Sequence, residues 1–159
     1  MSRDDRGSAA VLVIVMLPLL LGLFAGVIQM GAIRVIAARV ASAADLATLA
    51  AVDDQDEATL VRRGVLRLAP DADVVARRFF ALNLEQIAAH LAVSPEAAAQ
   101  QAAVAMFPDA PAVDRLTGWR YDLPTVRLAA KVPVRTPAFA MLLLPTTVTI
   151  EVRAASSAR

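Results

Sequence analysis

The sequence predicts an α+β fold in which an N-terminal transmembrane helix continues into a long helix and then into a small head of helices packed on a short antiparallel sheet. Three observations support this prediction. Residues 7–33 carry no charged side chain, and residues 34–52 continue without Gly or Pro at helical apolar spacing. The last third of the chain alternates apolar and polar residues with the period of two that is typical of strands.

The uncharged run is expected to be the membrane-spanning segment. Residues 8–33 form about 39 Å of helix at 1.5 Å per residue, which is enough to cross a hydrocarbon core of about 30 Å. The apolar region of a secretory signal is usually about 7–15 residues long, so we favour an anchor over a cleaved signal. Basic residues flank both ends of the run, and the positive-inside rule therefore does not set its orientation.

Small residues along this helix predict close packing. Gly22 and Gly26 form a small-xxx-small pair, which lets a second helix approach. The continuation of the helix, to about Val52, has a narrow face of small residues. The positions expected to take part in helix packing are Gly22, Gly26, Ala37, Ala44 and Ala47.

Two helices are expected in the first part of the head. The first covers about residues 72–91, with Val75, Phe79, Leu82 and Ile87 at helical spacing. The second begins at Ser94 as N-cap and Pro95 as first helical residue, and it is expected to end near Phe107. Residues 58–69 fit either a short helix or a strand.

Two antiparallel strands are expected at residues 125–135 and 146–153. Pro133 favours a position at a sheet edge for the first of them. The apolar connector between the strands contains residues 139–144, which could contact a membrane or a partner, although packing in the core is the favoured interpretation. Trp119 and Tyr121 fit a short preceding strand.

Composition argues against an enzyme. The chain has no cysteine, and His90 is its one histidine, so thiol catalysis, a histidine pair and a thiolate metal site are excluded. The net charge is only +1, from 16 basic and 15 acidic residues, without a basic cluster for nucleic acid. The acidic run at residues 53–57 is interpreted as a solvated turn rather than a calcium site. We expect no catalytic residue, no metal, no cofactor, no nucleic-acid partner and no small-molecule substrate.

The segment AADLATLAA at residues 43–51, together with Arg6-Gly7 at the start of the span, carries a family resemblance. The chain resembles the TadE/TadG-like proteins of tight-adherence (Flp) pilus assembly systems, whose usual pattern is AAD-x-AALAA. The signature positions are Ala43, Ala44, Asp45, Leu49 and Ala50. From the residues alone, Asp45 is either a solvated helix position or a contact to the head or a partner.

The resemblance implies a minor pilin or pseudopilin-like component of a tight-adherence pilus or a related secretion apparatus, which acts by helix packing and by contacts with other subunits. It implies a single pass through the bacterial cytoplasmic membrane. The short cytoplasmic N-terminus is then 1–7, the transmembrane helix 8–33, the helix extension 34–52, and the extracytoplasmic head 53–159. The alternative function is a membrane-tethered extracytoplasmic binding module unrelated to pili.

The TadE-like branch of this family is cut by a prepilin peptidase after a glycine, with glutamate at the fifth residue beyond the cut. In this chain Gly7 would be that glycine and Ser8 the new N-terminus, but Leu12 takes the place of the glutamate. Leucine cannot pair with a neighbouring terminal amine in lipid. We therefore favour an uncleaved anchor, as in TadG-like relatives.

Overall fold

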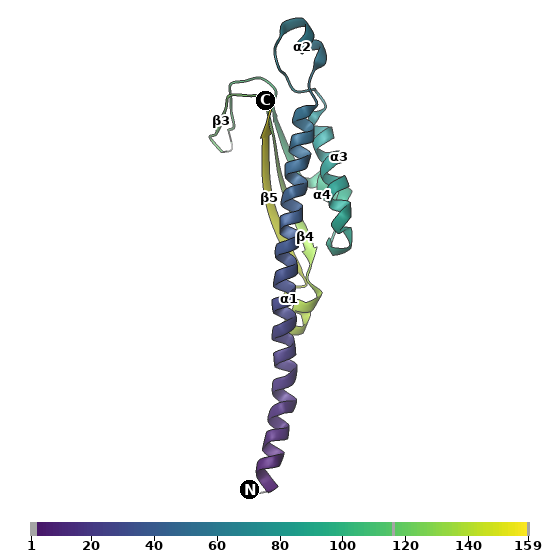
Figure 1. Cartoon of the computed structure of the whole chain (residues 1–159), viewed down its shortest axis with the longest axis vertical. Helices are drawn as coiled ribbons and strands as arrows, with labels where there is room; N and C mark the ends of the chain where they lie inside the picture. The colour runs from purple at the N-terminus through teal and green to yellow at the C-terminus, as the bar shows by residue number, and fades with distance from the viewer. Residues whose placement is uncertain (1–2, 116, 159) are drawn as a thin grey trace.

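The computed structural model describes residues 3–115 and 117–158, with side chains from Val11 onward. It has the predicted α+β fold. One long helix runs most of the length of the molecule, and the head packs mainly against its C-terminal half, so that the N-terminal end of the helix extends alone (Figure 1).

The long helix α1 covers Arg3–Asp53, 51 residues, without interruption at Pro18. The predicted continuous helix from near Ser8 to about Val52 is confirmed. Its two halves have different surroundings. Between Val11 and Met30 the exposed large apolar side chains are 42–72% accessible, whereas Ile36, Val40 and Ala44 are buried. The helix therefore changes from a free apolar rod to a core element along its length.

Four short helices follow: α2 Glu57–Arg63, α3 Ala72–Leu84, the 3-10 helix η1 Glu85–His90, and α4 Pro95–Gln101. The open choice for residues 58–69 is thus settled in favour of a helix, over residues 57–63. The helix predicted over residues 72–91 forms, although its last turns are 3-10.

The buried face of α3 differs from the one expected. Its buried residues are Ala72, Ala76, Phe80 and Leu84, whereas Phe79 and Leu82 are exposed. Both sets have helical spacing, so periodicity alone did not separate them. The buried face contains Ala72 and Ala76, and these small side chains let α3 approach α1, whose facing side is also made of small residues. Close packing of the two helices therefore favours burial of this face of α3.

The helix predicted from Pro95 to near Phe107 is wrong in its second half. Ser94 is the N-cap, and its hydroxyl accepts a hydrogen bond from the N–H of Ala97 at 3.2 Å, but α4 ends at Gln101. Ala103–Phe107 instead forms strand β1, which pairs antiparallel with β4. An alanine-rich segment has no strong strand preference of its own, and pairing with an existing strand edge overrides its helical propensity.

The main sheet has the order β1-β4-β5, with β4 at Thr125–Arg135 and β5 at Thr147–Ser157. The predicted bounds of β4 are confirmed, while β5 extends four residues beyond the predicted end at Arg153. β4 is the central strand rather than an edge strand. Pro133 is tolerated because it lies in the part of β4 that extends beyond β1, whose pairing covers only residues 125–129 of β4.

A second small sheet joins β2 Ala112–Val113 to β3 Arg120–Tyr121, so Tyr121 lies in the expected short strand and Trp119 directly before it. An ion pair ties this segment to the outer face of β4. The guanidinium of Arg127 lies 2.9 Å from Asp114 Oδ2, with both side chains largely buried.

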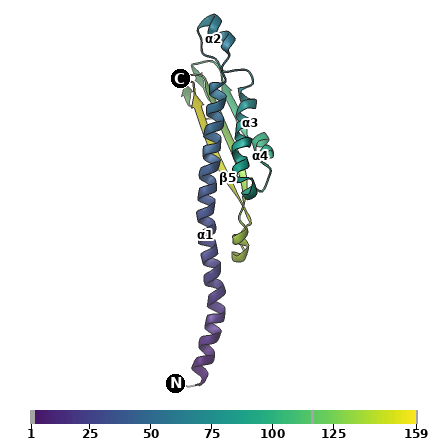
Figure 2. The same ribbon diagram turned by 45° about the vertical axis from the view of Figure 1, so that its right-hand side comes forward.

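The core lies between the main sheet and the helices. α1 and α3 lie side by side on one face of the main sheet, α1 against β4 and β5 and α3 against β1 and β4 (Figures 1 and 2). The largest fully buried side chains include Phe80, Leu84, Leu128, Val132 and Val134. The alternate residues of β4 and β5, such as Lys131 and Glu151, face solvent, so the head has two layers.

Candidate functional site on the long helix

The signature segment docks α1 onto the head. Ala43, Ala44, Ala47 and Ala51 are 3% exposed or less and lie in the apolar cores. Alanine at these positions lets the backbone of the helix approach the sheet closely, because a larger side chain would hold the two apart. The narrow small-residue face predicted for this half of the helix is therefore the face that the head covers.

A polar contact lies within this apolar interface. Thr48 is fully buried, its hydroxyl lies 2.9 Å from the hydroxyl of Ser156 on β5, and it donates to the backbone oxygen of Asp45 at 2.9 Å. A buried hydroxyl without a partner would destabilise the fold, so this pair favours one register of α1 on β5. Sequence reasoning missed this contact. The one signal was a lone threonine in an alanine-rich face.

The opposite face of the same turns is open. Leu46 and Leu49 are 48% and 50% exposed, and Asp45 is also exposed. Among the described residues no ion pair involves the Asp45 carboxylate. Of the two interpretations of Asp45, contact between its side chain and the head receives no support. A solvated position and contact with a partner both remain.

Gly22 and Gly26 face another part of the same chain. The apolar connector between β4 and β5 forms the 3-10 helix η2, Pro137–Leu142, and the Leu142 side chain lies over both glycines. A Cβ atom built on Gly26 would lie 2.8 Å from Leu142 Cδ1, and one on Gly22 would lie 3.2 Å from Cδ2. A side chain at Gly26 would therefore require Leu142 to move, and one at Gly22 would require a smaller shift of the same side chain.

The predicted packing positions therefore have intramolecular partners for the most part. Ala44 and Ala47 are fully buried under the head, Ala37 is half-buried, and the two glycines lie against η2. Packing of a separate helix at these positions stays a prediction. At Ala44 and Ala47 it would require the head to move away.

The N-terminal half of α1 is long and apolar enough to cross a membrane. Leu12, at the position of the family's glutamate, is 62% exposed on this apolar surface. Gly7 and Ser8 lie within α1, but their side chains fall outside the described set.

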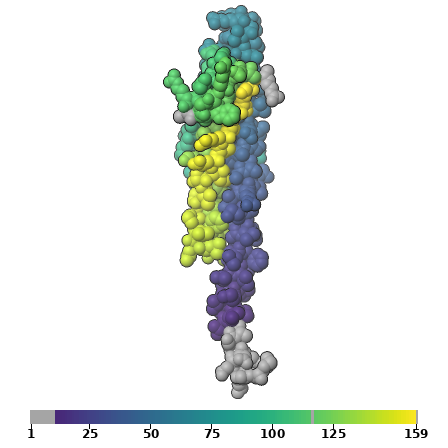
Figure 3. All heavy atoms as spheres, turned by 90° about the vertical axis from the view of Figure 1, so that its left-hand side faces the viewer, coloured from purple at the N-terminus to yellow at the C-terminus, as the bar shows by residue number. Residues whose placement is uncertain are grey.

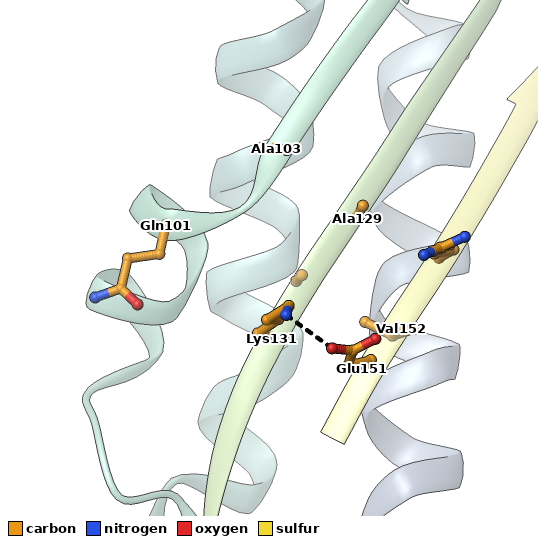
Figure 4. A pocket seen from close by; sticks show the side chains of 8 residues that line it. Gln101, Ala103, Ala129, Lys131, Glu151 and Val152 are labelled. Carbon is orange, nitrogen blue, oxygen red and sulfur yellow. Dashed lines mark ion pairs between the residues drawn. The ribbon is translucent and has the colours of Figure 1, made fainter. Parts of the chain in front are cut away.

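A shallow hollow of about 360 Å³ lies on the outer face of the sheet, where β1 begins (Figure 4). Lys131 Nζ and Glu151 Oε1 lie 2.8 Å apart at its rim, and this lysine lowers the pKa of Glu151 below its usual value. Both side chains are more than half exposed. They form a solvated cross-strand pair without a second reactive group, so the hollow lacks the features of an active site. Within the described residues, no group of three or more His, Cys, Asp or Glu side chains could hold a metal ion.

Residues 7–54 match the family described as "Putative Flp pilus-assembly TadE/G-like". This segment is TadE/G-like. The predicted resemblance is confirmed, and the matched range covers nearly all of α1. No curated protein and no solved structure matches the chain significantly.

The TadE/G-like segment thus includes both halves of the long helix, the largely exposed apolar half and the half that docks on the head. The match covers residues 7–54 and supports a pilus-associated role for this segment. The rest of the head lies outside the matched range, so its role has to be argued from its structure.

Proposed function

We propose that this chain is a minor pilin or pseudopilin-like component of a tight-adherence pilus or a related secretion apparatus. It is anchored by one pass through the bacterial cytoplasmic membrane, with the head on the extracytoplasmic side. The observation that carries the proposal is the division of the TadE/G-like helix into a free apolar half and a docked half. Monomeric soluble proteins rarely expose so large a contiguous apolar surface, and a bilayer would cover it.

The proposed mechanism is structural. A single helix of 51 residues is about 77 Å long, and it joins the membrane to the head without a hinge. The buried alanines and the Thr48–Ser156 contact hold the head on the helix, so a force on the head is transmitted to the anchor. The open face at Asp45, Leu46 and Leu49 is available for contact with other subunits.

Site-specific photocrosslinking in cells that assemble the apparatus tests this proposal. A photoreactive amino acid at Leu49 should form adducts with other pilus or secretion subunits, because this side chain is half exposed. The same amino acid at Leu84 on α3, which is also a leucine but fully buried, is the matched control and should form none. Adducts confined to proteins outside the pilus system, together with normal pilus assembly after deletion of the gene, would instead support the membrane-tethered binding module.

Processing is tested separately. We propose an uncleaved anchor, because Leu12 presents an apolar side chain where pairing with a terminal amine would need a carboxylate. The intact mass of the membrane-extracted protein should include residues 1–7. Loss of these seven residues would refute this part of the proposal and would identify Gly7 and Ser8 as a processing site.

A further inference from the structure

The connector between β4 and β5, residues 136–146, lies far down the long helix. In the space-filling view the yellow-green end of this hairpin lies against α1, beyond the rest of the head and towards the N-terminus (Figure 3). We propose that this connector inserts into the hydrocarbon region of the membrane leaflet on the head side and forms a second membrane contact beside the transmembrane helix. This inference rests on the proposed membrane anchoring.

The position of the connector on α1 is the first argument. A straight span of about 20 residues that excludes all charged side chains must lie within residues 7–33. The earliest such span is 7–26 and the latest is 14–33, so residues 14–26 lie in the hydrocarbon core in every case. Gly22 and Gly26 fall within this shared range, and Leu142 lies on both. A membrane that surrounds the helix therefore also surrounds Leu142.

The chemistry of the connector fits that environment. No charged residue occurs between Arg135 and Glu151. Met141 and Leu143 are 66% and 96% exposed, and Leu144 is 48% exposed. The favoured expectation that residues 139–144 pack in the core is therefore wrong for these side chains. Packing of the connector on α1 turns them outward, at the depth where the helix itself is apolar.

The backbone of the connector is largely satisfied without water, as a segment in lipid requires. Pro137 and Pro145 have no N–H group to satisfy. The ends are closed by two hydrogen bonds, from the N–H of Thr136 to the oxygen of Thr146 at 2.7 Å and from the Thr136 hydroxyl to the oxygen of Pro145 at 3.0 Å.

The tip of the connector is closed in the same way. The N–H groups of Leu143 and Leu144 donate to the oxygens of Ala140 and Phe139 at 3.1 and 3.0 Å. The N–H of Ala138 donates to Oε1 of Gln29 on α1 at 3.4 Å. Gln29 is the one amide side chain in the uncharged run, and this contact gives it a partner at that depth.

Basic residues lie at the expected level of the lipid headgroups. Arg135 directly precedes the connector, and Arg34 lies eight residues beyond Gly26, about 12 Å further along the helix. Arginine at this level can extend its charge towards lipid phosphates while its methylene groups stay in apolar surroundings. The change from the apolar connector to Arg34 and Arg135 thus matches the change from the hydrocarbon region to the lipid headgroups.

Fluorescence quenching in vesicles tests the insertion. The chain has no cysteine, so single-cysteine variants can be labelled with an environment-sensitive fluorophore without background. The full-length chain is reconstituted in phosphatidylethanolamine–phosphatidylglycerol vesicles with the label at Leu143. Phe24 on α1 is the matched lipid position, and Val61 on α2, 84% exposed at the far end of the head, is the matched water position.

The expected result is that brominated lipid quenches the label at position 143 as it does at position 24, and that aqueous iodide quenches only the label at position 61. Iodide quenching at 143 with lipid quenching retained at 24 would overturn the insertion and leave the anchor standing. Absence of lipid quenching at 24 would overturn the anchoring as well. Protection of 143 from both quenchers would overturn lipid contact in favour of a second copy of the chain covering the connector.

A substitution provides an independent check. Leu143→Asp places a charge at the most exposed apolar side chain of the connector, and it should make a label at Met141 accessible to iodide. Val113→Asp, at an exposed position in the head, is the control and should leave that label protected. Unchanged protection of Met141 in the Leu143→Asp variant would contradict the proposal.

Discussion

Replacement of Ala47 by Leu should loosen the head from the long helix. Ala47 is fully buried between α1 and the head, in a row with Ala43, Ala44 and Ala51. The substitution adds three carbon atoms to a closely packed interface where there is no room for them. Overpacking of this kind destabilises a core by about 1–3 kcal/mol. The expected loss is in the upper part of this range, because Ala47 is fully buried inside the main core cluster.

Ala38→Leu is the matched control, because it makes the same chemical change on the same helix at an exposed position. Its expected effect on the free energy of unfolding is within about 0.5 kcal/mol. Both variants can be compared in detergent micelles by urea unfolding, with pulse proteolysis as the readout, and by hydrogen exchange of the β5 amides.

The two measurements distinguish docking from helix propensity. Faster exchange in β5 with an intact helical signal is the expected pattern for Ala47→Leu, because α1 keeps its own hydrogen bonds when the head loosens. If Ala47→Leu loses no more stability than Ala38→Leu, the argument that the small-residue face holds the head on the helix is refuted.

Three further predictions concern other contacts. Gly26→Leu should displace the connector and speed the hydrogen exchange of its amides, because an added Cβ alone would lie 2.8 Å from Leu142 Cδ1. Gly31→Leu is the control and should leave this exchange unchanged, because nothing lies within 4 Å of an added Cβ there. Equal exchange in the two variants would contradict the contact. Thr48→Val should reduce the free energy of unfolding by about 1 kcal/mol, and a double-mutant cycle with Ser156→Ala in the same urea assay should show coupling between the two hydroxyls. Glu151→Gln should lower the melting temperature slightly at neutral pH and not at acidic pH, as measured by thermal melts across this range. A carboxyl whose pKa is lowered in the folded state stabilises the fold above its unfolded pKa, and this stabilisation is lost as the pH falls through the folded pKa. A difference between the two proteins that persists in acid would contradict this prediction.

The elements with strong local signals could be predicted from the sequence. The long helix followed from an uncharged run and an alanine-rich continuation, and the bounds of β4 followed from its alternation. Ser94 and Pro95 correctly marked the start of α4. In each case the signal lies within a few residues of the structure it specifies, so no knowledge of the rest of the fold is needed.

The errors have a common physical origin in contacts between distant segments. Ala103–Phe107 became a strand because β4 offered an edge to pair with. The alanine face of α3 was buried because α1 presents alanines to it. Neither outcome is encoded within the segment concerned, since each segment has two nearly equivalent local states and its partner selects one.

The candidate site likewise has one feature that the sequence predicts and one that depends on contacts between distant segments. The signature at residues 43–51 could be identified from the sequence, and its match to the TadE/G-like family agrees with it. The sequence did not reveal which side of the signature helix is free, because alanine, leucine and aspartate occur on successive residues. The structure shows that Ala43, Ala44 and Ala47 face the head, while Asp45 and Leu49 face outward.

The sequence by itself determined that this protein has one apolar helix long enough to cross a membrane, that the helix continues beyond the apolar run, and that it carries a TadE/G-like signature, because all three are properties of a continuous stretch of chain. Only the tertiary structure decided that Leu142 occupies the Gly22–Gly26 face and that Leu143 is exposed beside it. Small residues show where a close approach is permitted, but the element that makes the approach is set by the β4–β5 hairpin, more than a hundred residues away along the chain.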